Sequence, residues 1–197
     1  MKSLSLTKPH VIVMVGVPGS GKTFFAEKFA DTFHAPYISR DKISDIVADA
    51  ASADKLVLMM LEEFMKTKQS IIIEGPSLTR QERLAIYKLA RKASYEPMLV
   101  WVQTHQDTAR TRSLKINKPT IQSVRTAEDF DKEVKRFHAP TAQEKPVVIS
   151  GMHTYATQAR TVLKKLSHDR AEQPTARPTE RDTPPAPAAT RRNITIN

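Results

Sequence analysis

The sequence predicts an α/β fold in which a five-stranded parallel sheet lies between two layers of helices. Short apolar runs alternate along the chain with segments whose apolar residues recur every three or four positions, which is the spacing of an amphipathic helix. Strands separated by helices pair in parallel, and a nearly continuous apolar run such as Ser70-Ile71-Ile72-Ile73 is typical of a strand buried on both faces. A glycine-rich turn follows the first apolar run, as expected for a loop that connects a strand to a helix beside a ligand.

The elements follow in order from these patterns. Strands are expected at about residues 10–15, 37–38, 70–73, 98–102 and 147–149. Helices are expected after the glycine-rich turn (inner face Ala26, Phe29, Ala30, Phe33), from about Arg40 (Ile43, Ile46, Val47), around Val57, Met60, Leu61 and Phe64, after Thr79 (Ile86, Leu89, Ala90, Ala93), after Thr104–Asp107, over 126–137, and at the end (Tyr155, Ala159, Val162, Leu163, Leu166). Thr79 and Glu82 have the spacing of a capping box, which marks the start of a helix.

Composition limits the class of protein. The 197 residues suffice for one domain, expected over residues 1–168, followed by a Pro/Arg-rich tail at 169–197 that has too few large apolar side chains to fold. The longest apolar stretch, Val11 to Val15, is far too short to span a membrane. Cysteine is absent, which excludes disulfides and thiol chemistry and fits a cytoplasmic protein.

The net charge of +10 lies almost entirely in the predicted domain. From Asp169 to Asn197 five Arg stand against four acidic residues, which leaves about +9 for residues 1–168. A basic domain suits a polyanionic ligand such as a nucleoside triphosphate, a phosphorylated substrate or a nucleic acid. A generally basic surface would have the same charge, so composition alone leaves both interpretations open.

The glycine-rich turn matches the complete phosphate-loop pattern G-x-x-x-x-G-K-T between a strand and a helix. The glycines allow the backbone N–H groups to point at the phosphates of ATP, and the following helix directs the positive end of its dipole to the same place. Lys22 is expected to neutralise the β- and γ-phosphates, and the Thr23 hydroxyl to hold Mg²⁺. The predicted nucleotide site consists of Gly16, Val17, Pro18, Gly19, Ser20, Gly21, Lys22, Thr23 and Phe24.

Two more carboxylates follow predicted strands. Asp41, in Ser39-Arg40-Asp41, is expected to face the phosphate loop because strand ends in an open α/β sheet converge on the ligand. In one interpretation Asp41 accepts the proton of an incoming hydroxyl, and Arg40 either binds a substrate phosphate or orients Asp41. In the other, Asp41 is only a first-turn carboxylate that is stabilised by the positive end of the helix dipole. Glu74 either holds a Mg²⁺-bound water or touches the acceptor, or it is a structural carboxylate. The six histidines never reach metal-ligand spacing.

The pattern loosens between about Lys115 and Lys145. Nine Lys and Arg residues fall within 110–145, and Pro119 and Pro140 interrupt the segment. The region, about 110–140, is expected either to form a mobile lid over the nucleotide or to be an ordinary long surface connection.

The chain resembles the P-loop kinases of the polynucleotide 5′-hydroxyl kinase and zeta-toxin-like type, a group of small ATP-binding proteins with an AAA domain. The resemblance rests on GVPGSGKT, on the strand ending in Ser-Arg-Asp, and on the apolar strand that runs into Pro76-Ser77-Leu78-Thr79-Arg80-Gln81-Glu82-Arg83. It covers about residues 10–165 and implies a nucleoside-kinase-like fold with a lid.

The resemblance also implies roles for particular residues. The Asp of the Arg-Asp pair is the general base in that family, which corresponds to Asp41, and lid arginines reach the transferring phosphoryl group, which corresponds to Arg110 or Arg112. The loop 150–153 corresponds to the one that contacts adenine. Ser44 stands where the polynucleotide kinases often have an arginine, and Gly75-Pro76-Ser77 replaces their Asp-Thr-Asn, which counts against a nucleic-acid acceptor.

Two functions remain compatible with the sequence. The first is a kinase that transfers the γ-phosphate of ATP to a hydroxyl of a small molecule or of a polynucleotide 5′ end. The second is an ATP-binding switch protein that hydrolyses ATP slowly and acts on RNA or on a protein partner. The sequence identifies neither the acceptor nor the oligomeric state.

Overall fold

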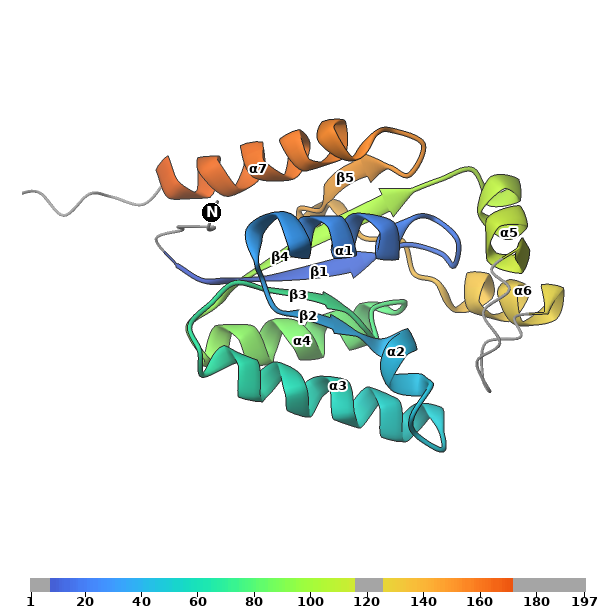
Figure 1. Ribbon diagram of the computed structural model, residues 1–197, viewed down its shortest axis with the longest axis horizontal. Helices are drawn as coiled ribbons and strands as arrows, with labels where there is room; N and C mark the ends of the chain where they lie inside the picture. Colours follow the sequence, from blue (N-terminus) through green and yellow to red (C-terminus); the bar gives the residue numbers. More distant parts are fainter. Residues whose placement is uncertain (1–7, 116–125, 172–197) are drawn as a thin grey trace, which may run out of the picture.

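The predicted sheet is present in the computed structural model, which describes residues 8–115 and 126–171. Its five strands have the order β2-β3-β1-β4-β5, and every pairing is parallel (Figure 1). The strands are β1 (His10–Val15), β2 (Tyr37–Ser39), β3 (Ile71–Glu74), β4 (Glu96–Gln103) and β5 (Val147–Ser150). The α/β fold class predicted from the alternating patterns is therefore confirmed.

Helices cover both faces of the sheet (Figure 1). On one face lie α1 (Lys22–Phe33) and α7 (Tyr155–Ala171), and on the other α3 (Ala50–Met65) and α4 (Arg80–Lys92). The shorter helices α2 (Arg40–Ser44), α5 (Gln106–Lys115) and α6 (Ala127–Arg136) lie beyond the carboxyl ends of the strands, and a 3₁₀ turn, η1 (Ala142–Glu144), precedes β5.

The central strand β1 shows why the sheet needs both layers. Its side chains alternate between two hydrophobic clusters, with Val11, Val13 and Val15 on the α3/α4 side and Ile12 and Met14 on the α1/α7 side. All five are completely buried. A strand buried on both faces has no polar side, which explains its uninterrupted apolar sequence.

The parallel register brings the strand ends to one edge of the sheet. Ser39 pairs with Glu74, Val15 with Trp101, and Gln103 with Ser150. The phosphate loop, α2 and the loops that follow β3, β4 and β5 consequently begin along this edge. This is where an open α/β sheet binds its ligand.

Two boundaries differ from those expected. Helix α2 ends at Ser44, so Ile46 is not on its inner face as predicted but is 80% exposed. The chain turns here because Asp49 caps the next helix, its Oδ1 accepting a hydrogen bond from Ser52 N at 2.9 Å. Helix α7 continues to Ala171, past the predicted start of the tail, and residues 172–197 lie outside the described part of the chain. No described helix is long and apolar enough to cross a membrane.

Candidate active site

The phosphate loop has the backbone that its glycines are required to provide. Gly16, Gly19 and Gly21 have φ values of 149°, 70° and 105°, in the region that other residues rarely adopt. A Cβ on Gly19 would lie only 2.1 Å from the carbonyl oxygen of Ala109 on α5. Glycine at position 19 is therefore needed both for the turn and for the close approach of α5.

The start of α1 is open to an anion. Its N-cap, Gly21, provides no side-chain hydrogen bond, and no acidic residue occupies the first turn. The Oγ of Ser20 is buried and has no hydrogen-bond partner among the described residues. Lys22 Nζ donates to Val17 O at 3.0 Å and so lies beside the loop. Free amides, an unpartnered hydroxyl and an ammonium group fit the phosphates of a nucleotide.

Residues outside the motif hold the loop in place. Thr104 Oγ1, just after β4, donates to Ser20 O at 2.8 Å, and Ser77 Oγ, after β3, donates to Met14 O at 2.8 Å. Gly151, after β5, packs so closely that a Cβ on it would lie 1.9 Å from Ser20 O. Sequence reasoning missed these supporting roles of Thr104 and Ser77, because neither residue belongs to a pattern that specifies them.

Glu74 lies directly beneath Thr23. The carboxylate is 7% exposed, its Oε1 accepts a hydrogen bond from Thr23 Oγ1 at 2.9 Å, and its Oε2 accepts one from Tyr37 OH at 2.7 Å. Burial, and next the negative charge of Glu74, hold the pKa of Tyr37 above its usual range, so the phenol remains a donor. A hydroxyl beside a buried carboxylate is a set of oxygen ligands that suits Mg²⁺. Within residues 8–115 and 126–171, no group of three His, Asp or Glu side chains could hold a metal ion.

Arg40 and Asp41 occupy the first turn of α2, at the carboxyl end of β2. Asp41 is exposed. The guanidinium of Arg40 is paired through Nε with Asp54 of α3, and both side chains are partly exposed. The sequence predicted that Arg40 would orient Asp41 or bind a substrate phosphate, and its partner on α3 was not foreseen.

The two candidate lid arginines have different surroundings. Arg112 donates through Nη1 to Gly151 O at 3.0 Å and lies 3.3 Å from Met152 Sδ, against the loop predicted to contact adenine. Arg110 forms an ion pair with Asp131 of α6 at 3.3 Å, near the surface. Helix α6 confirms the helix expected over 126–137, whereas the segment 116–125 lies outside the described residues.

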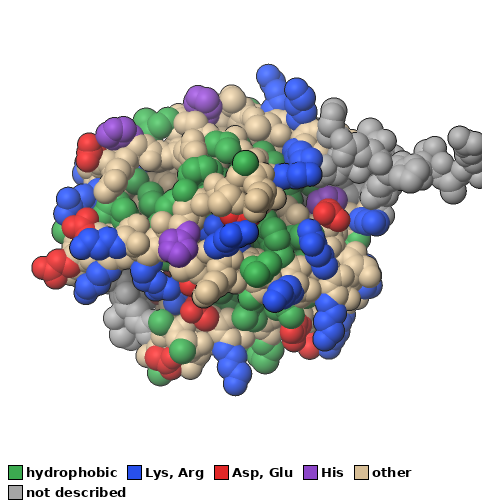
Figure 2. All heavy atoms as spheres, turned by 180° about the vertical axis from the view of Figure 1, so that it is seen from behind, with side chains coloured by type: hydrophobic (Ala, Val, Ile, Leu, Met, Phe, Trp, Pro, Cys, Tyr) green, Lys and Arg blue, Asp and Glu red, His purple; other side chains and the backbone are tan. Residues whose placement is uncertain are grey.

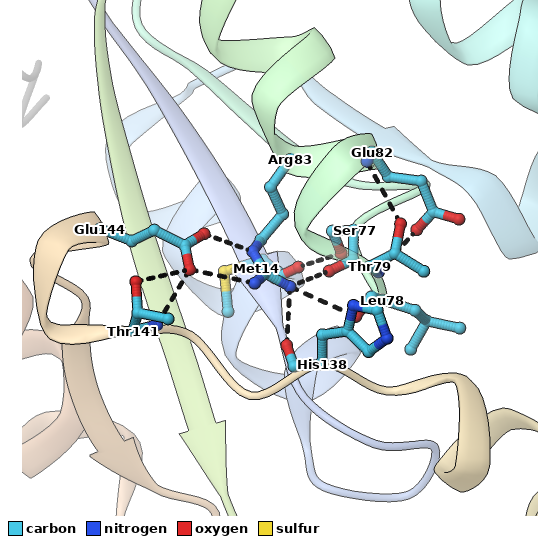
Figure 3. A network of polar contacts seen from close by, with 9 residues as sticks. All are labelled: Met14, Ser77, Leu78, Thr79, Glu82, Arg83, His138, Thr141 and Glu144. Atoms are coloured by element: carbon cyan, nitrogen blue, oxygen red, sulfur yellow. Dashed lines mark hydrogen bonds and ion pairs between the residues drawn. The ribbon is translucent and has the colours of Figure 1, made fainter.

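A buried arginine anchors residues 137–146, here called the return segment, which lead from α6 to β5 (Figure 3). Arg83 is 1% exposed, its Nε lies 2.7 Å from Glu144 Oε1, and its Nη1 donates to the carbonyl oxygens of Ser77, Leu78 and His138. Burial raises the pKa of Glu144, but hydrogen bonds from Arg83 and Thr141 and the charge of Arg83 outweigh it and lower the pKa overall. In the sequence, Arg83 is only the last residue of the motif that begins at Pro76. Its burial was not predicted, because nothing in a single sequence distinguishes a buried arginine from an exposed one.

A cavity of about 530 Å³ lies at the ends of β4 and β5, beside the phosphate loop. Its walls are mainly apolar, and none of the described residues that line it is Lys, Arg, Asp or Glu. Figure 2 shows the molecule from behind, where hydrophobic side chains are exposed among Lys and Arg side chains that are spread over this face. The lining residues are Val17, Trp101, Val102, Gln103, Thr104, His105, Phe137, Val148, Ser150 and Met152. Trp101, expected in the core, packs there only partly, 6.4 Å from Phe137 between ring centroids.

Solved structures share this fold at low sequence identity. A gluconokinase from Sinorhizobium meliloti 1021 is 17% identical, with a TM-score of 0.61 over 83% of this chain and 94% of its own. A sugar kinase from Janibacter sp. HTCC2649 is 18% identical, with a TM-score of 0.58 over 83% and 97%. Chaetomium thermophilum Kti12, in complex with ADP-AlF3, is 19% identical, with a TM-score of 0.61 over 81% and 98%. The fold is therefore P-loop kinase-like.

Sequence comparison gives the family. No curated protein matches the chain. The family model described as AAA domain matches residues 11–140, more than half of the chain, and this range includes the phosphate loop, Glu74 and both candidate lid arginines. The chain belongs to this family of AAA domain proteins, and its phosphate loop is a site for ATP.

Proposed function

We propose that the protein is a kinase that transfers the γ-phosphate of ATP to a hydroxyl group of a small molecule. The observation that carries the proposal is the contact of Thr23 with the buried Glu74 at the open start of α1. It combines an anion site with oxygen ligands for a cation, which is what a magnesium–nucleotide complex requires. The kinase-like fold of the neighbouring structures supports phosphoryl transfer over the alternative of a slow ATPase switch.

The nucleotide is proposed to lie along the strand ends. Lys22 and the loop amides would bind the phosphates, and Thr23 would hold Mg²⁺ with Glu74 behind it. The base is assigned to the cavity beside Val17, where Ser150 and Met152 form part of the wall. Arg112 would steady the loop at 150–152 through its bond to Gly151 O.

Asp41 is proposed to be the general base. Bound MgATP would supply the electrophilic γ-phosphorus, and Asp41 would accept the proton of the acceptor hydroxyl as its oxygen forms the new P–O bond and ADP leaves. An exposed carboxylate at the end of β2 is accessible to an acceptor from solvent. Arg40, held by Asp54 through Nε and partly exposed, would bind an acidic substituent of the acceptor through its guanidinium.

A small molecule is favoured over a polynucleotide as the acceptor. Ser44 stands where polynucleotide kinases often have an arginine that grips nucleic-acid phosphate, and Gly75-Pro76-Ser77 replaces their Asp-Thr-Asn. Two of the neighbouring structures are a gluconokinase and a sugar kinase, which supports sugars and sugar acids as the first class of acceptor to test.

The test is a screen with γ-labelled ATP. Purified protein is incubated with sugars, sugar acids, nucleosides, antibiotics and 5′-hydroxyl DNA and RNA, and the products are separated to find the labelled compound. We expect label on one class of small hydroxyl compound. Label only in inorganic phosphate, released faster when a macromolecular partner is added, would contradict the proposal and favour the switch.

A further inference from the structure

The contacts of Glu74 leave it a buried anion with both oxygens already occupied. Thr23 donates to Oε1 and Tyr37 donates to Oε2, at 2.9 and 2.7 Å. Among the described residues no Lys or Arg lies within salt-bridge distance of this carboxylate. Two hydroxyl donors stabilise the charge only in part, so a cation at this place would be bound favourably.

Tyr37 reaches Glu74 because of the sheet register. Glu74 pairs with Ser39 across β2 and β3, and Tyr37 is two positions before Ser39, so its side chain leaves the same face of the sheet. That face carries α1 with Thr23. The phenol and the threonine hydroxyl thus approach the carboxylate from two different elements, and its orientation is fixed from both sides.

The orientation of Glu74 decides what Thr23 offers to a ligand. While the hydroxyl proton of Thr23 points at Oε1, the lone pairs of its oxygen are free for a metal ion. Tyr37 prevents the carboxylate from turning away, because turning would leave Oε2 buried without its donor. A residue that orients a ligand in this way commonly changes metal affinity by a factor of 10–100.

From this geometry we infer that Tyr37 is a positioning residue for the magnesium ion of the bound nucleotide, acting through Glu74 on Thr23. The inference rests on the nucleotide binding of the proposed function but not on phosphoryl transfer. It also restricts Glu74, because a carboxylate committed to Thr23 and Tyr37 acts on the metal and not on the acceptor hydroxyl.

The test compares ADP binding with and without magnesium. Calorimetry on the full chain gives the Kd for ADP in excess Mg²⁺ and in EDTA, and the ratio of the two is the magnesium enhancement. We expect Tyr37→Phe to lower this enhancement about 10-fold while the Kd in EDTA stays unchanged. Tyr95→Phe is the matched control, because it also removes a buried phenol bond, 3.1 Å to Met65 O, but away from the site.

A double-substitution cycle isolates the route through Glu74. In a Glu74→Gln background, Tyr37→Phe should have no further effect on the magnesium enhancement. An unchanged enhancement in Tyr37→Phe, an equal weakening with Mg²⁺ and with EDTA, or a further loss in the Glu74→Gln background would each overturn the inference. If wild-type protein binds MgADP but labels no acceptor, only the kinase proposal fails, and the enhancement still decides the role of Tyr37.

Discussion

Two proposed regions lie along the same edge of the sheet but are held in different ways: the nucleotide region, which comprises the phosphate loop and Glu74, and the acceptor region, which comprises Arg40, Asp41 and Arg110. In the nucleotide region, buried or partly buried hydrogen bonds from Thr104, Ser77 and Tyr37 fix the phosphate loop and Glu74. In the acceptor region the charged side chains lie on short helices near the surface. Arg40 and Arg110 are tied by ion pairs to Asp54 and Asp131, whose side chains are 40% and 47% exposed.

This difference indicates that the two regions have different roles. A buried network holds groups in one geometry, which suits phosphates and a metal ion that every reaction cycle shares. Exposed ion pairs contribute about 0–1 kcal/mol each and can be exchanged for contacts with a substrate. We therefore expect substitutions in the nucleotide region to weaken the binding of the magnesium–nucleotide complex, and those in the acceptor region to change transfer with nucleotide binding intact.

The largest effect is expected from Lys22→Met. Without the ammonium group the charge of the phosphates is not neutralised, and transfer should be abolished. The assay is transfer of label from γ-labelled ATP to the acceptor found in the screen. Lys66→Met, at an exposed lysine paired with Glu63 at the end of α3, is the control and should keep full activity.

Asp41→Asn tests the expectation for the acceptor region, that transfer changes while nucleotide binding stays intact. If Asp41 is the base, the transfer rate should fall about 10²–10⁴-fold while calorimetry finds the same Kd for MgADP. Asp45→Asn, an exposed carboxylate at the other end of α2, is the matched control and should transfer at the wild-type rate. Equal rates for Asp41→Asn and wild type would remove Asp41 from the mechanism.

Arg83→Met tests whether the return segment is held by a buried network, as the nucleotide region is. The change leaves Glu144 without its cation and three carbonyls without a donor, which should lower the free energy of unfolding by about 3–5 kcal/mol. Chemical denaturation measures the loss. Arg136→Met removes the exposed pair with Glu82 and should cost no more than about 1 kcal/mol.

The same pair predicts a pH dependence. The pKa of Glu144 is lower in the folded than in the unfolded protein, so the pair stabilises the fold above the unfolded value of about 4.5, and this contribution is lost as the pH falls below it. Denaturation curves between pH 7 and pH 3 should therefore converge for wild type and Glu144→Gln at the acid end. A difference in stability that stays constant down to pH 3 would contradict this assignment.

The smallest effects are expected at the lid arginines. Arg112→Ala removes a hydrogen bond to Gly151 O and should raise the Kd for ADP about 5-fold. Arg110→Ala breaks a surface pair with Asp131, so its effect on ADP binding should stay within about 1 kcal/mol. A larger loss of transfer in Arg110→Ala than in Arg112→Ala would identify Arg110 as the arginine that acts on the phosphoryl group.

Local patterns predicted the elements well because they depend on neighbours in the chain. A few neighbouring residues are enough to predict the conformation in three cases: the apolar run of β1, the capping box of Thr79 with Glu82, and the glycines of the phosphate loop. The prediction for helix α2 is too long, because the apolar residues after Ser44 continue its pattern whereas Asp49 caps the next helix.

The sequence alone determined the fold class, the location of the phosphate loop and its chemistry, since periodicity and the G-x-x-x-x-G-K-T spacing are local properties of the chain. The tertiary structure alone decided that Tyr37 and Thr23 converge on Glu74, that Arg83 is buried against Glu144, and that Arg112 meets Gly151. These partners are 37 to 61 residues apart in the chain. Strand register and helix packing bring them together, and a single sequence records neither.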